Sequence, residues 1–279
     1  MDWSERLQQI DRRWIYLFII VMVSIAILRP LGLPVRITDT TRMLYDHIES
    51  LPPGSVVWLG MEYSTGSIAE LNPQIIAVVH HIFKKDLKLI VSGMWQDGPM
   101  IAQGLIEPLA EKYGKEYGVD WVNLGFRAGG TPYIRLMTED IMEATAGVDH
   151  FSKPLKDYPL MQQVPRLTKE YVDFIIVADT GTPGSPEWLA YVSDPQGIPM
   201  GVCIIQMSVP GMMPYVQAGQ YVGLVPGLRG AAEYEILVGE TGPAVTGTDT
   251  SSMAAILVTL FIILGNIGYV MSVRRKEQE

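Results

Sequence analysis

The sequence predicts an α/β fold: a doubly wound, mostly parallel five-stranded sheet (Rossmann-like) flanked by an N-terminal and a C-terminal transmembrane helix. Five short apolar runs alternate with helical patterns through the middle of the chain. Most of these runs are continuously apolar rather than alternating, as expected for strands that helices cover on both faces. Two longer blocks without a charged residue lie near the two ends.

The terminal blocks have the composition of membrane-spanning helices. The first carries no charge from Trp14 to Leu28, and the second carries none from Met253 to Val273. Crossing the hydrocarbon core takes roughly 20 apolar residues, so the first block needs an extension to residue 35. A signal peptide is the alternative for the first block, but the following LRPLGLPV lacks the small residues of a cleavage site. We therefore expect an uncleaved anchor over residues 14–35.

Basic residues near the two blocks predict the orientation. Those on the tails are Arg6, Arg12, Arg13, Arg274, Arg275 and Lys276, and those on the domain side are Arg29, Arg36 and Arg42. Because basic residues collect on the cytoplasmic side of a bilayer, the tails (1–13 and 274–279) are expected in the cytoplasm. The domain over 36–240 is then extracytoplasmic, and a flexible polar tether over 241–252 leads to the second span, 253–273.

The formal charge of −9 resides in the domain. The N-terminal tail is neutral and the C-terminal tail is one unit positive, which leaves about −10 on the residues between them. An acidic surface argues against nucleic acid and anionic lipid headgroups as partners of the domain. The expected partners are the lipid bilayer around the two spans and other membrane proteins or copies of the chain itself. Cys203 is the one cysteine, so the fold depends on a hydrophobic core rather than on internal disulfides.

The elements of the domain can be assigned in order. Strands are expected over Ser55–Leu59, Leu87–Val91, Asp120–Leu124, Phe174–Ala178 and Met200–Gln206. Ile68–Lys85 and Pro99–Tyr117 supply the first two crossover helices, and later helices begin at Thr131-Pro132 and Ser185-Pro186, where a capping hydroxyl precedes proline. This alternation predicts right-handed crossovers within one sheet. The irregular stretch Val148–Leu167 is expected to be a surface flap.

Polar residues follow several of the expected strands. In an open parallel sheet, ligands bind outside the carboxyl ends of the strands. The candidates there are Glu62, Asp97, Arg127 and Asp179. Arg127 would hold an anionic group, and one carboxylate would act as a base. The same residue types also cap helices and form turns, so a purely structural role is the competing interpretation.

Several catalytic patterns are incomplete. Asp179-Thr180-Gly181 matches the D-T-G signature of aspartic proteases, but that chemistry needs two such carboxylates and one copy is present. GFRAGG over 125–130 lacks the spacing of a dinucleotide fingerprint. His80 and His81 are adjacent on an expected helix and point to different faces, so they do not form a metal-binding pair. The sequence therefore predicts no catalytic set, no metal and no cofactor.

The most unusual stretch is Pro210–Val238. Gly219, Gly223, Gly227 and Ala231 recur every four residues, which on a helix would form a stripe that permits close approach. Because glycine weakens a helix, such a stripe calls for a packing partner. This partner is either the chain's own sheet, with the helix broken near Pro226, or else a second copy, another protein or the membrane surface. In the second span, Asn266 is a polar side chain of the kind that pairs across helix interfaces.

Two functions are compatible with these features. The leading hypothesis is a non-catalytic, homo-oligomeric module that assembles or scaffolds a membrane complex through the glycine stripe and Asn266. The alternative is an extracytoplasmic enzyme or ligand-binding domain that uses the crevice at the strand ends. A raised carboxyl pKa in a formed pocket would favour the alternative, whereas carboxylates engaged in helix capping would count against it.

Overall fold

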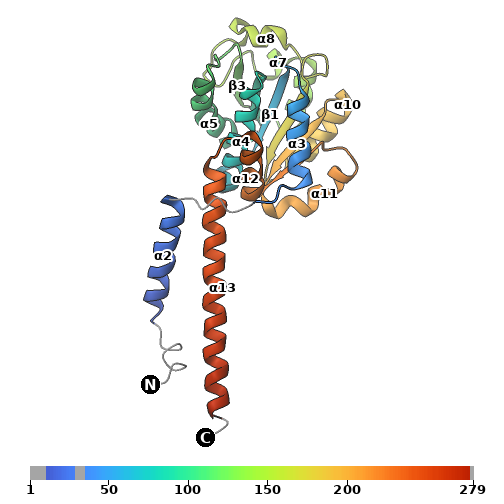
Figure 1. The fold of residues 1–279 in the computed structure, drawn as a ribbon. Helices are drawn as coiled ribbons and strands as arrows, with labels where there is room; N and C mark the ends of the chain where they lie inside the picture. The colour runs from blue at the N-terminus through green and yellow to red at the C-terminus, as the bar shows by residue number, and fades with distance from the viewer. Residues whose placement is uncertain (1–10, 29–34, 277–279) are drawn as a thin grey trace. The chain divides into compact units, whose positions relative to one another are not determined.

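The computed structural model describes residues 11–28 and 35–276 of the chain. Two compact units are present: an α/β domain, Val35–Ala244, and a second unit that contains the two terminal helices. Figure 1 shows the sheet of the domain with helices on both of its faces. The expected α/β class is therefore confirmed.

Within the described residues, six parallel strands form one sheet in the order β3-β2-β1-β4-β5-β6. The strands are β1 Val56–Glu62, β2 Lys88–Gly93, β3 Trp121–Phe126, β4 Phe174–Asp179, β5 Met200–Ile204 and β6 Leu224–Pro226. Nearly all their side chains are buried, which explains the uninterrupted apolar runs. Five strands lie where they were predicted. The sixth has three residues, too few for a recognisable apolar run.

The strand order reverses beside β1. From β1 the chain adds β2 and β3 on one side, and β4 then pairs with the other edge of β1. Glu62 and Asp179, the last residues of β1 and β4, are direct partners in this register. This reversal is the topological switch point at which doubly wound folds usually bind ligands.

Two helical layers bury the sheet between two hydrophobic cores. One core includes residues of α3 Asp39–Ser50, α4 Ile68–Lys84, α5 Asp97–Tyr113 and α12 Gly227–Val238. The other includes residues of α6 Thr131–Glu139, α7 Ile141–Ala144, α8 Pro159–Gln163, α9 Ser185–Trp188 and α11 Val209–Gln217. A π-helical turn, Leu189–Ser193, and α10 Asp194–Gln196 follow α9.

The stretch Val148–Leu167 is not the surface flap that its sequence suggested. Leu155, Leu160 and Leu167 are fully buried and belong to the second core. The single-turn helix η2, Leu155–Asp157, and α8 provide the local backbone hydrogen bonds of this segment. The expectation was wrong because the apolar residues of this segment are irregularly spaced. Such spacing is typical of short turns, and it gives no periodic pattern from which burial can be predicted.

The predicted glycine stripe does not form on one helix. Gly219 lies in a turn after α11 with φ of 73°, and Gly227 begins α12 with φ of 53°. Gly223 lies between these helices, and a Cβ there would come 2.4 Å from the backbone nitrogen of Leu44. Only Ala231 lies within a helix interior. The stretch is helical at both ends, in α11 and α12, but the expectation of one helix that carries all four small residues is wrong. A role of these residues at an interface stays a prediction.

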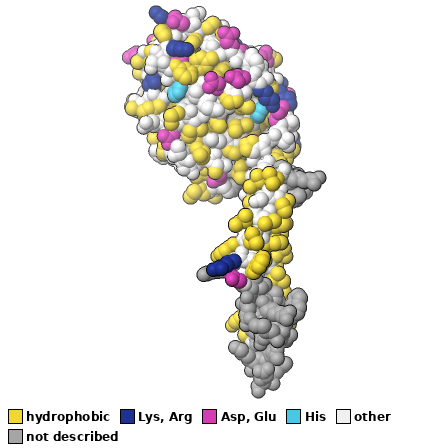
Figure 2. All heavy atoms as spheres, turned by 90° about the vertical axis from the view of Figure 1, so that its left-hand side faces the viewer, with side chains coloured by type: hydrophobic (Ala, Val, Ile, Leu, Met, Phe, Trp, Pro, Cys, Tyr) yellow, Lys and Arg dark blue, Asp and Glu magenta, His cyan; other side chains and the backbone are white. Residues whose placement is uncertain are grey.

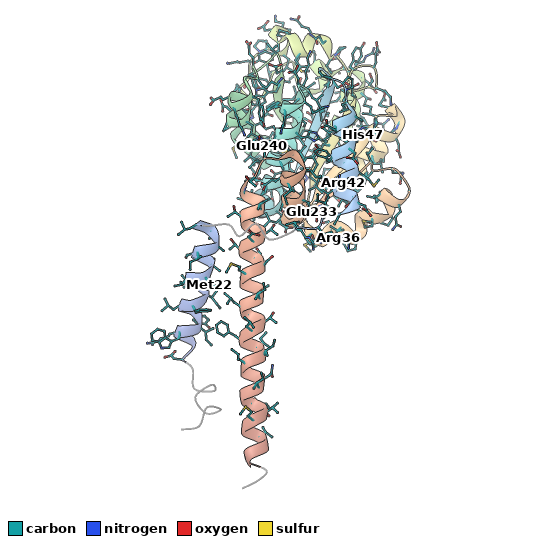
Figure 3. All side chains as sticks on the ribbon, in the orientation of Figure 1. Met22, Arg36, Arg42, His47, Glu233 and Glu240 are labelled. Carbon is teal, nitrogen blue, oxygen red and sulfur yellow. The ribbon has the colours of Figure 1, made fainter. Side chains whose placement is uncertain are left out.

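Carboxylates of α12 fix the start of two other helices. Glu233 accepts hydrogen bonds from the backbone nitrogen (2.8 Å) and hydroxyl (2.6 Å) of Thr38, immediately before α3 (Figure 3). Glu235 accepts bonds of 3.0 Å from the nitrogens of Gly242 and Ala244. Carboxylates satisfy the free N–H groups of a helix start and complement its dipole.

The helix that begins at this cap, α13, runs from Pro243 to Lys276 over 34 residues. The expected flexible tether over 241–252 is therefore helical from Pro243 onward. By length and composition, one helix of the described chain can cross a membrane, over Pro243–Met271. Figure 2 shows hydrophobic side chains on the exposed surface of the terminal helices.

The N-terminal helix α2, Arg12–Leu28, has 17 residues and is too short to meet the same criterion. Its expected extension toward residue 35 falls on residues 29–34, outside the described residues, as do residues 1–10 and 277–279 of the two tails. A second span and the orientation of the domain stay predictions.

Candidate functional site

Glu62 is fully buried at the switch point. Its Oε2 accepts a hydrogen bond of 2.8 Å from the backbone nitrogen of Met94, and its Oε1 accepts one of 2.9 Å from Nε1 of Trp188. Burial raises the pKa of Glu62 to about 8, although these N–H donors favour the charged form. Among the described residues, Glu62 forms no ion pair. The carboxyl group thus ties β1 to the loop after β2 and to α9.

Asp179 ends the neighbouring strand and is 2% exposed. Burial also raises the pKa of this carboxyl group, while hydrogen bonds from Ser185 oppose the shift. Its Oδ2 accepts a bond of 2.5 Å from the backbone nitrogen of Ser185, at the first residue of α9. A Cβ on Gly184 would lie 2.9 Å from the carboxyl carbon, so only glycine fits this turn. Asp179 therefore acts as a helix cap.

The other two predicted residues serve neighbouring loops. Oδ2 of Asp97 accepts a bond of 3.1 Å from the backbone nitrogen of Thr65, in the loop after β1. Arg127 donates to the carbonyl oxygens of Phe126, Thr145 and Val148 at distances between 2.8 and 3.2 Å. Its guanidinium is thus engaged with the loop after α7 instead of holding an anion beside the carboxyl pair.

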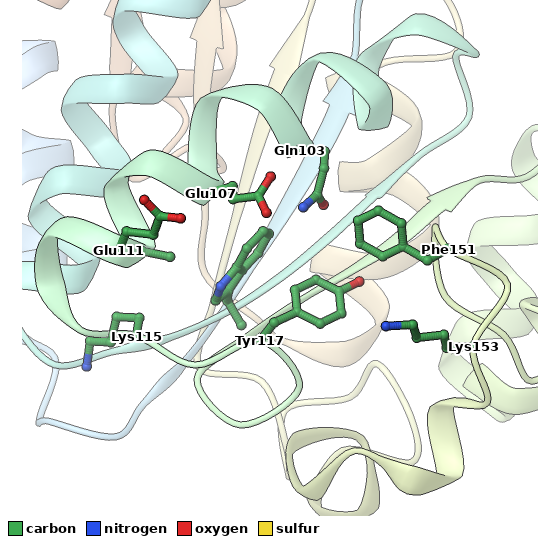
Figure 4. Close-up of a pocket in the computed structure, with 9 residues that line it drawn as sticks. Gln103, Glu107, Glu111, Lys115, Tyr117, Phe151 and Lys153 are labelled. Carbon is green, nitrogen blue, oxygen red and sulfur yellow. The ribbon is translucent and has the colours of Figure 1, made fainter.

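A pocket of about 380 Å³ lies at another place, beside the edge strand β3 (Figure 4). This volume falls within the range of small-molecule sites. The pocket is lined by Gln103, Glu107, Ala110, Glu111, Lys115, Tyr117, Trp121, Phe151 and Lys153. In Figure 4, the acidic residues come from α5 and the aromatic residues lie across from them.

Asp149 holds one wall of this pocket and is 2% exposed. Its Oδ2 accepts hydrogen bonds from the hydroxyls of Tyr117 (3.0 Å) and Tyr158 (2.7 Å). Its Oδ1 accepts bonds of 2.8 Å from the backbone nitrogens of Phe151 and Lys153. Four donors on one carboxylate fix the loop that carries two of the lining residues, so the wall forms without a ligand.

Aromatic rings meet at steep angles around the pocket. The ring of Tyr117 is 4.8 Å from that of Trp121 at 89°, and 5.7 Å from that of Phe151 at 68°. Burial and the nearby Asp149 carboxylate raise the pKa of Tyr117, which keeps its hydroxyl a neutral donor. Edge-to-face contacts of this kind stabilise the cluster, and they orient the rings in different directions.

The charged residues of the pocket differ in their pairing. Lys115 forms an ion pair with Asp86, outside the pocket lining. The Nζ of Lys153 lies 5.8 Å from the centre of the Phe151 ring. Glu107 and Glu111 have no ion-pair partner within the residues that the structure describes. Both glutamates are exposed, so their carboxylates face solvent at the edge of the pocket.

A second pocket, of about 390 Å³, is lined by Thr131, Pro132, Arg135, Leu136, Glu139 and Tyr191. Tyr191 is its one aromatic lining residue, and the guanidinium of Arg135 lies 6.0 Å from the centre of that ring. This arrangement offers a ligand fewer ring faces than the pocket beside β3. It provides a matched control for experiments on that pocket.

The residues of the β3 pocket were not among the sequence candidates. Sequence reasoning addressed the carboxyl ends of strands, whereas Tyr117 and Trp121 flank the beginning of β3. The density of aromatic residues at Tyr117, Trp121 and Phe151 was the available signal. Residues 11–28 and 35–276 contain no cluster of three or more side chains suited to hold a metal ion.

Comparison with protein-family models, with curated proteins and with solved structures finds no match to this chain. Its function therefore has to be inferred from its own residues.

Proposed function

We propose that the chain is a membrane-anchored binding protein whose α/β domain holds a small ligand in the pocket beside β3. The Asp149 network carries this proposal, because it fixes one wall of the pocket before any ligand arrives. Pre-organisation of this kind spares the ligand the cost of ordering a loop. The anchor is α13, and the basic residues of the tails favour a domain outside the cytoplasm.

Binding at this pocket is favoured over chemistry at the switch point. Glu62 and Asp179 are buried and already engaged by backbone or indole donors. Arg127, the cation that an anionic substrate would need, is bound to carbonyl oxygens. The β3 pocket instead presents open volume together with unpaired charged groups and aromatic faces.

A ligand screen on the full chain in maltoside detergent tests this proposal. The variant Phe151→Ala removes one wall, and it should spare the core because Phe151 is 48% exposed. Tyr191→Ala is the matched control, since Tyr191 is 41% exposed and lines the second pocket. We expect compounds that bind the wild type and the Tyr191 variant alike but lose binding to the Phe151 variant. Hits that bind all three proteins equally would contradict the proposal.

Self-association through α13 is a second candidate function, supported by Asn266. This side chain is exposed and lies among apolar residues, and its amide nitrogen donates to the carbonyl of Ile262 in the same helix over 2.9 Å. Among the described residues, no donor reaches its amide oxygen, which a neighbouring helix could satisfy. The glycines of Pro210–Val238 add little to this candidate, because Gly223 packs against Leu44 inside the domain.

The mass of the purified protein in detergent tests the second candidate. Asn266→Leu should convert an oligomer to a smaller species, as measured by light scattering with the detergent contribution subtracted. Thr259→Val is the control, because the hydroxyl of Thr259 is also exposed on α13 and bonds its own backbone at Ala255. An unchanged mass for Asn266→Leu would remove the support for assembly through this helix.

A further inference from the structure

We propose that the pocket beside β3 binds a substituted ammonium ion, an inference that rests on the proposed binding function. The lining combines two unpaired carboxylates with three aromatic rings. Aromatic faces carry negative electrostatic potential and attract organic cations such as substituted ammonium ions. Hard metal cations such as Ca²⁺ and Mg²⁺ instead require several oxygen ligands.

The rings form the corner of a cage. Tyr117 stands almost perpendicular to Trp121, at 89°, and steeply to Phe151, at 68°. Trp121 is 2% exposed, so it supports Tyr117 and does not itself present a face to the pocket. A compact cation would contact the rings of Tyr117 and Phe151, whose faces are inclined to each other and reach it from two sides. Hydrogen bonding of Tyr117 to Asp149 holds the central ring in this orientation.

The acidic residues supply the matching charge. Glu107 and Glu111 lie four residues apart on α5, so they are neighbours on one face of the helix. Like charges at this spacing destabilise a helix, and no described cation pairs with either residue. A bound ammonium group would relieve this repulsion.

The lysines do not reverse this charge. Asp86 already neutralises Lys115, whose side chain is 8% exposed. Lys153 is exposed, and its ammonium group lies 5.8 Å from the ring centre of Phe151. The pocket therefore already holds one ammonium group against an aromatic ring at its rim, which is the interaction proposed for the ligand.

Three probes of nearly the same shape test the inference on the full chain in maltoside detergent. They are choline, the neutral isostere 3,3-dimethylbutan-1-ol and the anionic isostere 3,3-dimethylbutanoate, with binding followed by ligand-observed NMR. We expect choline to bind about tenfold more tightly than the neutral alcohol, and the carboxylate more weakly than either.

Variants connect that preference to the pocket. The double variant Glu107→Gln/Glu111→Gln should weaken choline binding by about tenfold and leave the alcohol unaffected. Lys153→Met should strengthen choline binding, because it removes a competing cation. Glu139→Gln is the control, since Glu139 lines the second pocket. Substitution of exposed glutamates by glutamine spares the fold, which is checked by the unfolding transition.

The outcomes separate this inference from the proposed function. If the alcohol or the carboxylate bound more tightly than choline, and Phe151→Ala weakened that binding, the ammonium class would be wrong but the pocket would still be supported as a binding site. The ammonium class would also be wrong if choline bound the glutamate variants as tightly as the wild type, or if no probe bound. In either case the wider ligand screen decides whether the pocket binds ligands at all. Competition by soluble dihexanoylphosphatidylcholine distinguishes a lipid headgroup from a free amine: tighter binding than choline assigns the headgroup, and weaker binding assigns the free ion.

Discussion

The hydroxyl of Tyr117 donates a hydrogen bond of 3.0 Å to Oδ2 of Asp149, which joins the turn before β3 to the loop after α7. The same carboxylate also accepts bonds from Tyr158, Phe151 and Lys153. One buried acid therefore determines the shape of the pocket wall.

Replacement of Asp149 by alanine should destabilise the domain strongly. The change removes the shared acceptor of two hydroxyls and two backbone N–H groups, all partly buried, and each hydrogen bond to a charged group is worth about 1.5–3 kcal/mol. The hydroxyl of Tyr117 keeps a longer bond of 3.3 Å to the carbonyl oxygen of Asn123. Tyr158→Phe removes one of the four bonds and should lower the free energy of unfolding by about 1 kcal/mol. Urea unfolding followed by tryptophan fluorescence measures both values. Equal effects of the two variants would contradict the central position of Asp149.

The free energy of unfolding should decrease as pH rises toward 8, because of Glu62. Its folded-state pKa, about 8, exceeds the ordinary value of 4.5, so the folded state retains a proton that the unfolded state releases. This stabilisation is complete below pH 4.5 and declines by on the order of 1 kcal/mol per pH unit up to the folded pKa. Glu62→Gln should abolish this component of the slope.

The range from about pH 7.5 to 8.5 isolates this effect. Burial lowers the folded-state pKa of His47, His80 and His81, and unfolded histidines lose their protons around pH 6.5, so above this value by about one pH unit these three groups are neutral in both states. Trp188→Phe removes a donor that favours the charged form of Glu62 and should move the decline to higher pH. Parallel pH profiles for the wild type and Glu62→Gln would show that Glu62 is ionised in the folded protein, contrary to expectation.

Two glycine substitutions should change stability in opposite directions. Gly223→Ala should destabilise the domain by more than about 1 kcal/mol, because the new Cβ would lie 2.4 Å from the backbone nitrogen of Leu44. Gly104→Ala places its Cβ in open space on α5 and should stabilise the protein by about 0.5–1 kcal/mol. Thermal unfolding of both variants provides the comparison. A neutral Gly223→Ala would indicate that α3 can move away from this loop.

Sequence patterns predicted the fold where burial is uniform. The strands around Trp58 and Ile176 lie in the centre of the sheet, and their continuous apolar runs led directly to a parallel α/β fold. The same reasoning failed at β6, where three residues among glycines carry no periodic signal. It also failed at 241–252, because the cap from Glu235 that begins α13 comes from another helix.

The candidate site was less accessible to sequence reasoning. Glu62 and Asp179 were correctly associated, since equivalent ends of adjacent parallel strands must meet. Arg127 was not distinguishable from a ligand-binding arginine, because its carbonyl partners lie in a loop without a recognisable pattern. The β3 pocket depends on Tyr117 and Asp149, which are 32 residues apart and are brought together by tertiary packing.

Protection of a cysteine at the rim of the pocket beside β3 shows whether this pocket binds a small ligand. Cys203 is fully buried and burial raises its pKa to about 12, so a cysteine introduced as Lys153→Cys can be alkylated selectively. We predict that some members of a library of small amines, alcohols and acids slow alkylation at position 153 without slowing it at Glu139→Cys in the second pocket. If no compound protects position 153 selectively, the proposed binding function is wrong.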